Sequence, residues 1–115
     1  MTGLVKTFAE GFPAGQAVRL EEMIAYGDNA VVSRTLAKSD SGTLTLFAFD
    51  AGQELSEHTA PFDALVQILE GKAVLTIEGE AVPAEAGQNV LMPAGVPHAL
   101  SAETPMKMVL FMLRK

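Results

Sequence analysis

The chain contains no cysteine. This absence excludes disulfide bonds, thiolate metal ligands and a cysteine nucleophile together. No apolar run comes near the roughly 18 residues that a membrane-spanning helix needs, and the segment from Met1 to Phe12 lacks the basic start and apolar run of a signal peptide. We therefore expect a cytoplasmic protein that does not cross a membrane.

Positive charge is also scarce. The chain has 8 Lys and Arg against 14 Asp and Glu, a net charge of -6 and a pI near 4.7. Nucleic acids and anionic membranes both require a basic surface, so neither is an expected partner. Small molecules, metals and copies of the chain remain. With 115 residues, of which 49% are hydrophobic, the chain is long enough for one domain with its own core.

Short alternating runs separated by turn residues predict an all-β sandwich or barrel. The expected strands cover residues 31–37, 43–49, 64–69, 73–77, 89–92, 98–102 and 106–113, with a short return at 81–82 that Pro83 stops. Residues 78–80 fit a tight hairpin turn in which Gly79 takes a positive φ. Residues 19–25 fit one or two helical turns. We expect an amino-terminal extension over 1–25, packed on the barrel or on a partner, and the barrel over 26–115.

Two segments carry glycine, proline and histidine at a recognisable spacing. Both resemble the two halves of the cupin signature, G-x5-H-x-H-x3-E-x6-G and G-x5-P-x-G-x2-H-x3-N, through Gly52, His58 and Gly71 in the first and Gly87, Pro93, Gly95 and His98 in the second. The string His-Thr-Ala-Pro-Phe-Asp-Ala from residue 58 is also similar to a variant found in small bacterial and archaeal single-domain cupins. The resemblance covers about residues 30–113 and implies the cupin double-stranded β-helix, a jelly-roll barrel.

In cupins the two histidines and the glutamate of the first motif join the histidine of the second motif around one metal ion. Here Ala60 stands in place of the second histidine and Ala64 in place of the glutamate, while Ala102 replaces the final asparagine. The resemblance therefore implies a reduced site in which His58 and His98 hold Zn, Ni, Mn or Fe. Hydrogen bonds from both rings to the backbone are the alternative.

Other polar residues near the first motif are less suited to a metal site. Alternation along the strand places Val66 on one face and Gln67 on the other, so Gln67 reaches the cavity only if the strand carries a bulge. Asp63 has the same parity, and Glu57 is a further candidate. The predicted cavity set is His58, His98, Gln67, Ala60 and Met92. No catalytic residue is assigned, since the chain has neither a G-x-S-x-G elbow nor a glycine-rich phosphate loop.

Three functions stay open. The first is binding of a small, mostly apolar molecule in the barrel cavity, which Ala60 and Ala64 enlarge. The second is a metal-dependent enzyme of the dioxygenase or isomerase type. The third is a structural dimer module that acts through a partner. A homodimer is expected because the last strand is apolar on both faces, with Met108, Leu110 and Met112 on one and Val109, Phe111 and Leu113 on the other.

Overall fold

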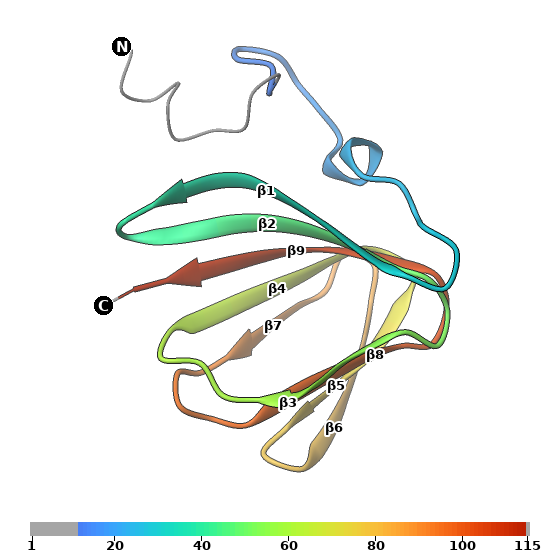
Figure 1. Ribbon diagram of the computed structural model, residues 1–115, viewed down its shortest axis with the longest axis vertical. Coiled ribbons are helices and arrows are strands. Elements are labelled where there is room, and N and C mark those ends of the chain that lie inside the picture. The colour runs from blue at the N-terminus through green and yellow to red at the C-terminus, as the bar shows by residue number, and fades with distance from the viewer. Residues whose placement is uncertain (1–11, 115) are drawn as a thin grey trace.

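The computed structural model describes residues 12–114, and this part of the chain forms nine strands and one short 3-10 helix (Figure 1). The elements are η1 (Leu20–Met23), β1 (Val31–Ser39), β2 (Gly42–Phe49), β3 (Glu54–His58), β4 (Asp63–Glu70), β5 (Lys72–Ile77), β6 (Glu80–Glu85), β7 (Asn89–Met92), β8 (His98–Ala102) and β9 (Met106–Leu113). Within this range no helix has the length and apolarity to span a bilayer.

The strands form two antiparallel sheets that face each other. One sheet has five strands in the order β1-β2-β9-β4-β7, and the other has four in the order β3-β8-β5-β6. The carboxyl-terminal strand β9 lies between β2 and β4, and β8 lies between β3 and β5, so strands distant in sequence pair at the centre of both sheets. This arrangement confirms the predicted all-β jelly roll in a single domain.

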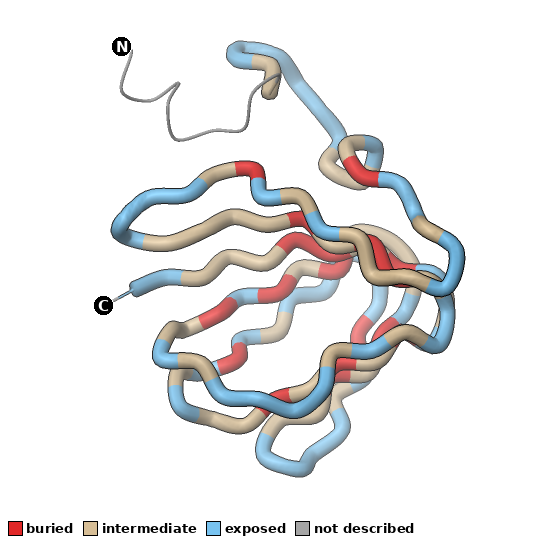
Figure 2. The backbone as a smooth tube through the Cα atoms, in the orientation of Figure 1, coloured by how far each residue is buried: buried red, intermediate tan, exposed pale blue. Residues whose placement is uncertain are grey.

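The main core fills the space between the sheets. The inward residues of both sheets are almost fully buried there, and Figure 2 colours the buried stretches of the backbone red. They include Val66, Ile68 and Met108 from the five-stranded sheet and Leu75 and Leu100 from the four-stranded sheet. Their period-two spacing along each strand is what the sequence pattern predicts for half-buried strands.

A second core cluster lies on the outer face of the five-stranded sheet. Ile24 and the η1 segment pack there against Leu46, Ala48 and Val109. Two cationic side chains fix the segment: the Arg34 guanidinium donates to the Met23 carbonyl at 2.9 Å, and the Lys107 ammonium donates to the Glu21 carbonyl at 2.6 Å. The described part of the amino-terminal extension thus lies on the sheet of its own chain.

One sequence prediction about the strands is wrong. Pro83 does not stop the return strand, because β6 continues to Glu85 and pairs Pro83 with Val74. As the edge strand of its sheet, β6 needs no ladder donor on its outer side, and there a proline is tolerated. The turn before it agrees with expectation: Glu78 and Gly79 both take positive φ, 51° and 80°, as a two-residue hairpin of type I′ requires.

Candidate functional site

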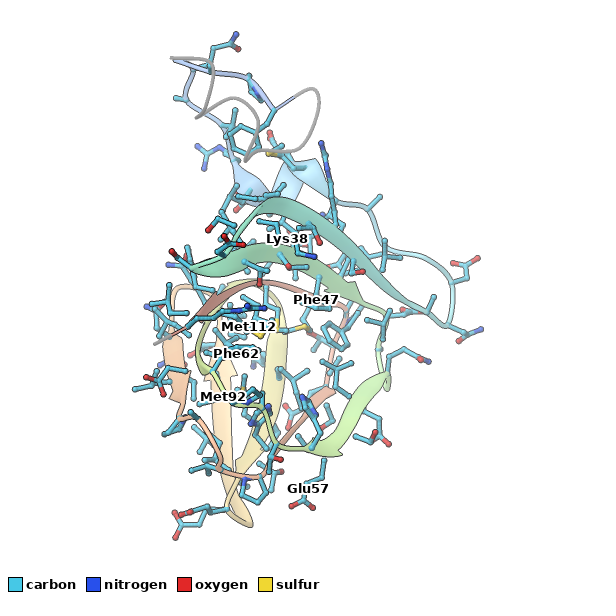
Figure 3. The ribbon with its side chains drawn as sticks, turned by 60° about the vertical axis from the view of Figure 1, so that its left-hand side comes forward. Lys38, Phe47, Glu57, Phe62, Met92 and Met112 are labelled. Atoms are coloured by element: carbon cyan, nitrogen blue, oxygen red, sulfur yellow. The ribbon has the colours of Figure 1, made fainter. Side chains whose placement is uncertain are left out.

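The two sheets enclose a cavity of about 60 Å³ at one end of the barrel. Figure 3 shows Met92 and Met112 pointing into the space between the sheets. The lining is apolar except for two imidazoles, and consists of Leu55, His58, Ala60, Ala64, Met92, His98, Ala99, Leu100, Met108, Leu110 and Met112. An apolar wall with a few polar groups is the usual composition of a small-molecule pocket.

The two histidines come from neighbouring strands of the four-stranded sheet. His58 ends β3, His98 begins β8, and the two residues are direct partners in the ladder. Their Nε2 atoms are 3.2 Å apart, and the rings meet edge to face at 73° with centroids 4.4 Å apart. His98 is 5% exposed, whereas His58 is exposed and faces solvent. One imidazole therefore lies in the cavity wall and the other at its rim.

Backbone carbonyls set the tautomer of both rings. Nδ1 of His58 lies 2.9 Å from the carbonyl oxygen of Ser56, and Nδ1 of His98 lies 3.0 Å from that of Val96. A carbonyl oxygen can only accept, so each Nδ1 carries a hydrogen and donates it. In the neutral rings both Nε2 atoms then present a lone pair, and the two lone pairs converge across 3.2 Å.

Two converging lone pairs repel each other unless something positive lies between or beside them. A proton shared by the two Nε2 atoms meets this need, and so does a cation bound by both. Either one would place positive charge at the end of a cavity that is otherwise apolar.

The opposite wall of the cavity is built around Ala64. Its neighbours across the ladder are Met92 on β7 and Met112 on β9, so the small side chain lies between two thioethers on the same face. The loop between β7 and β8 is held to the chain between the end of β3 and the start of β4 by two hydrogen bonds. The Gly95 amide donates to the Ala60 carbonyl at 2.8 Å, and the Ala94 amide donates to Oδ1 of Asp63 at 2.9 Å.

The structure brings together four of the five predicted cavity residues. His58, Ala60, Met92 and His98 all line the cavity, but Gln67 does not. The inner positions of β4 are Ala64, Val66 and Ile68. No bulge shifts Gln67 onto their face, because it pairs in regular register with Asn89 and Val109.

The two carboxylates considered as extra ligands have other places. Asp63 holds the β7–β8 loop through its bond to Ala94, and Glu57 is exposed and does not line the cavity. Met108, Leu110 and Met112 were predicted to share a face, but their place opposite the histidines was not predicted. The period-two spacing along β9 was the sequence signal that predicted the shared face. The pairing of β9 with β4, which places that face opposite the histidines, had no such signal.

The donor set does not match a three-histidine, one-carboxylate metal site. Among residues 12–114, no three or more side chains of histidine, cysteine, aspartate and glutamate gather where one ion would fit. Only the two Nε2 atoms converge, and Ala60 and Ala64 supply no ligand atom. The occupancy of the pair by Zn, Ni, Mn or Fe stays a prediction.

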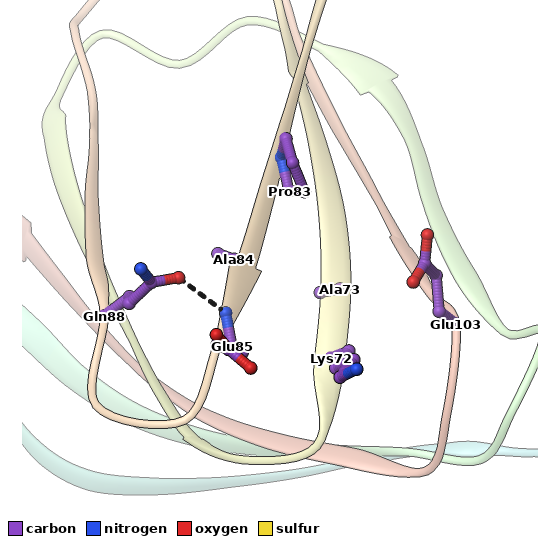
Figure 4. Close-up of a pocket in the computed structure, with 7 residues that line it drawn as sticks. All are labelled: Lys72, Ala73, Pro83, Ala84, Glu85, Gln88 and Glu103. Carbon is purple, nitrogen blue, oxygen red and sulfur yellow. Dashed lines mark hydrogen bonds between the residues drawn. The ribbon is translucent and has the colours of Figure 1, made fainter.

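A larger hollow of about 340 Å³ lies at the other end of the four-stranded sheet (Figure 4). Charged side chains of both signs surround it: Lys72 and Glu85 on paired strand positions, and Glu103 after β8. Gln88 accepts from the Glu85 amide at 2.9 Å, which fixes the β6–β7 turn at its edge. It contains neither histidine and has no converging set of donors, so the barrel cavity is the better candidate site.

Comparison with known proteins places this architecture in a family. The family model described as the cupin domain matches residues 45–113, which is more than half of the chain. The chain therefore belongs to the cupin family, and the resemblance drawn from the two motifs is confirmed. A comparison with curated protein sequences gives no significant match.

Solved structures agree with this assignment over nearly the whole chain. A conserved Streptococcus pyogenes protein of unknown function is 33% identical, with 95% of this chain and 96% of that one covered and a TM-score of 0.88. A cupin superfamily protein from Desulfitobacterium hafniense is 29% identical, covers 92% and 97%, and has a TM-score of 0.87. An RmlC-like cupin from Desulfovibrio desulfuricans is 27% identical, covers 85% and 95%, and has a TM-score of 0.75. These similarities are to proteins whose names give no substrate.

Proposed function

We propose that this cupin binds a small, mostly apolar molecule in the barrel cavity and holds its polar end at the His58–His98 pair. The observation that carries the proposal is the composition of the cavity wall: nine apolar residues and two imidazoles with converging Nε2 atoms. A pocket with an apolar wall and a few convergent polar groups is the usual form of a small-molecule site.

The volume limits the size of the ligand. A cavity needs about 10–15 Å³ of such interior volume to hold one water molecule, so a cavity of about 60 Å³ holds a ligand of only a few heavy atoms. Larger molecules would have to extend past His58, which is exposed at the rim. Short-chain alcohols and short-chain carboxylic acids are the probes that fit this description.

The methionines provide a direct test. We would label the methionine methyl groups with ¹³C and add each of these probes in turn to the protein. Binding in the cavity shifts the methyl signals of Met92, Met108 and Met112, which line it, and leaves that of Met106, which is buried elsewhere in the core, unchanged. Ala64→Val narrows the cavity and should remove the shifts while the fold is kept. If no probe shifts the three signals selectively, the proposal is wrong.

The second candidate is a metal-dependent enzyme of the dioxygenase or isomerase type, and one observation favours it. The Nε2 atoms of His58 and His98 converge as two ligands of one ion do. When bound, a divalent Zn, Ni, Mn or Fe would act as a Lewis acid on a small substrate in the same cavity. Metal analysis of untagged protein tests this candidate, and less than about a tenth of an equivalent of these metals would count against it.

We also propose that the chain forms a homodimer. The extension covers only part of the outer face of the five-stranded sheet, and beyond it Leu65 and Leu91 are direct ladder partners that remain 38% and 57% exposed. Phe111 is the other partner of Leu65, and Leu113 follows it on the same face with 61% exposure. An apolar row across three strands favours burial against a second sheet, and a second copy supplies the matching surface.

A further inference from the structure

We propose that the barrel cavity is a copper(I) site, formed by Nε2 of His58 and His98 and by the thioether sulfurs of Met92 and Met112. This inference concerns the same cavity as the proposed function, but it does not depend on an organic ligand. It follows from three features of the cavity: the direction of the nitrogen lone pairs, the register of the methionines and the absence of carboxylates from the described lining.

The nitrogen donors are already arranged for one ion. Because both Nδ1 atoms donate to carbonyls, each Nε2 is free to act as a ligand of neutral imidazole. With metal–nitrogen distances of about 2.0–2.1 Å, two atoms 3.2 Å apart bind a shared ion at an angle of roughly 100°. That angle suits a trigonal or tetrahedral ion and leaves the remaining positions for donors on the facing sheet.

The facing sheet offers sulfur. Met92 and Met112 flank Ala64 on the inner face of the five-stranded sheet, and both line the cavity together with the two imidazoles. The side chain of Ala64 is too small to block the access of the two thioether sulfurs to the cavity. Thioether sulfur is a soft ligand that selects copper(I), whereas imidazole binds zinc, nickel, iron and copper alike. The combination of donors therefore discriminates in favour of copper(I).

Charge favours the same ion. No aspartate or glutamate belongs to the lining that residues 12–114 form, so a divalent ion would leave two uncompensated charges in an apolar wall. Copper(I) adds only one charge. The replacement of a carboxylate and a histidine by Ala64 and Ala60 thus shifts the site from hard divalent ions towards a soft monovalent ion.

The test is an anaerobic titration of the metal-free protein with copper(I), in competition with the chromophoric chelator bicinchoninate. We expect one equivalent of copper(I) to bind, at least about a hundredfold more tightly than Zn(II), Ni(II) or Mn(II) under the same conditions. Silver(I), which has no redox chemistry here, should bind with the same stoichiometry. Failure to compete with the chelator, or tighter binding of any of the divalent ions, would overturn the proposal.

Matched variants separate ligands from core packing. Met92→Leu with Met112→Leu preserves volume but removes both sulfurs, and should lower the copper(I) affinity about tenfold or more. It should also remove the sulfur contribution to the X-ray absorption spectrum of the bound copper. Met106→Leu is the control, because Met106 is fully buried and does not line the cavity, so copper(I) affinity should not change. Equal affinities for the double variant and the control would contradict the sulfur ligands.

The nitrogen ligands are tested at the exposed member of the pair. His58→Ala changes a rim residue, so the barrel should remain folded, and copper(I) binding should fall at least about a hundredfold. Retained binding in this variant would refute the site. Organic probes are measured separately with metal-free protein, so the cavity can fail to bind copper(I) and still bind a small molecule, and the reverse can also be observed.

Discussion

Ala60 and Ala64 line the same cavity although Ala60 follows the end of β3 and Ala64 lies within β4. These are the two positions at which the cupin signature has a histidine and a glutamate. Their side chains lie in the cavity that contains His58 and His98, so the positions of the lost ligands are still directed at the remaining ones. The register of the first motif is therefore kept while its chemistry has changed.

Restoring both ligands should create a site for divalent metals. Ala60→His with Ala64→Glu supplies a third imidazole and a carboxylate, and the buried carboxylate should lower the stability of the metal-free protein by about 1–3 kcal/mol. Nickel, zinc or manganese at about 100 times its dissociation constant should add about 2.7 kcal/mol. Thermal melts with and without each ion measure both effects. A folded variant that binds these ions no better than the parent would show that the two positions are not directed at the histidines.

The dimer should depend on the exposed leucines of the five-stranded sheet. Light scattering at micromolar concentration should give a particle mass of twice the 12.1 kDa chain mass. Leu65→Lys with Leu91→Lys places two charges in the apolar row and should give monomers, since both side chains point outward and the barrel core is untouched. Val18→Lys, at a 40% exposed position on the extension, is the control and should leave the mass unchanged. A wild-type mass of one chain throughout a dilution series would contradict the dimer.

The barrel could be predicted from the sequence because the signals for it are local patterns along the chain. Period-two alternation identified the inner face of each strand, and motif spacing placed His58 and His98 in one cavity. It did not predict that Pro83 lies in an edge strand, since the strand order β3-β8-β5-β6 depends on pairing between distant segments. The two sulfurs beside Ala64 were missed for the same reason: Met92 and Met112 meet there only through the pairing of β7 and β9 with β4.

Replacement of Gly71, a glycine of the first motif, should destabilise the protein through a steric clash, and comparison with a second glycine isolates that effect. Gly71 and Gly79 both have φ of +80°, but a Cβ at Gly71 would lie 2.2 Å from the Pro105 carbonyl oxygen, whereas one at Gly79 meets nothing within 4 Å. Gly79→Ala should therefore cost only the left-handed backbone, about 1–2 kcal/mol. Gly71→Ala should cost about 3 kcal/mol or more because the turn that precedes β9 must also move. Chemical denaturation of the two variants measures the difference, and equal losses would contradict the steric argument.

Tyr26 should make the stability of the protein fall at high pH. Its hydroxyl donates to Oε2 of Glu70 at 2.5 Å, which ties the chain segment before β1 to the end of β4. Partial burial first, and then the hydrogen bond and negative charge of Glu70, raise the pKa of Tyr26 well above its usual value. The ring is still 38% exposed, so solvent screens part of this effect.

The direction of the pH dependence follows from proton binding. The unfolded chain loses the Tyr26 proton near pH 10, whereas the native state keeps it to higher pH. Above pH 10 the native state therefore binds more protons than the unfolded state, and the free energy of unfolding falls as the pH rises. Tyr26→Phe has no such proton, so the gap in stability between wild type and variant should be constant below about pH 9 and shrink above pH 10. Urea denaturation of both proteins from pH 7 to 11 measures the gap. Lys107 and Glu70 are present in both proteins, so their titration does not change it. A gap that stays constant to pH 11 would show that the tyrosine proton does not contribute.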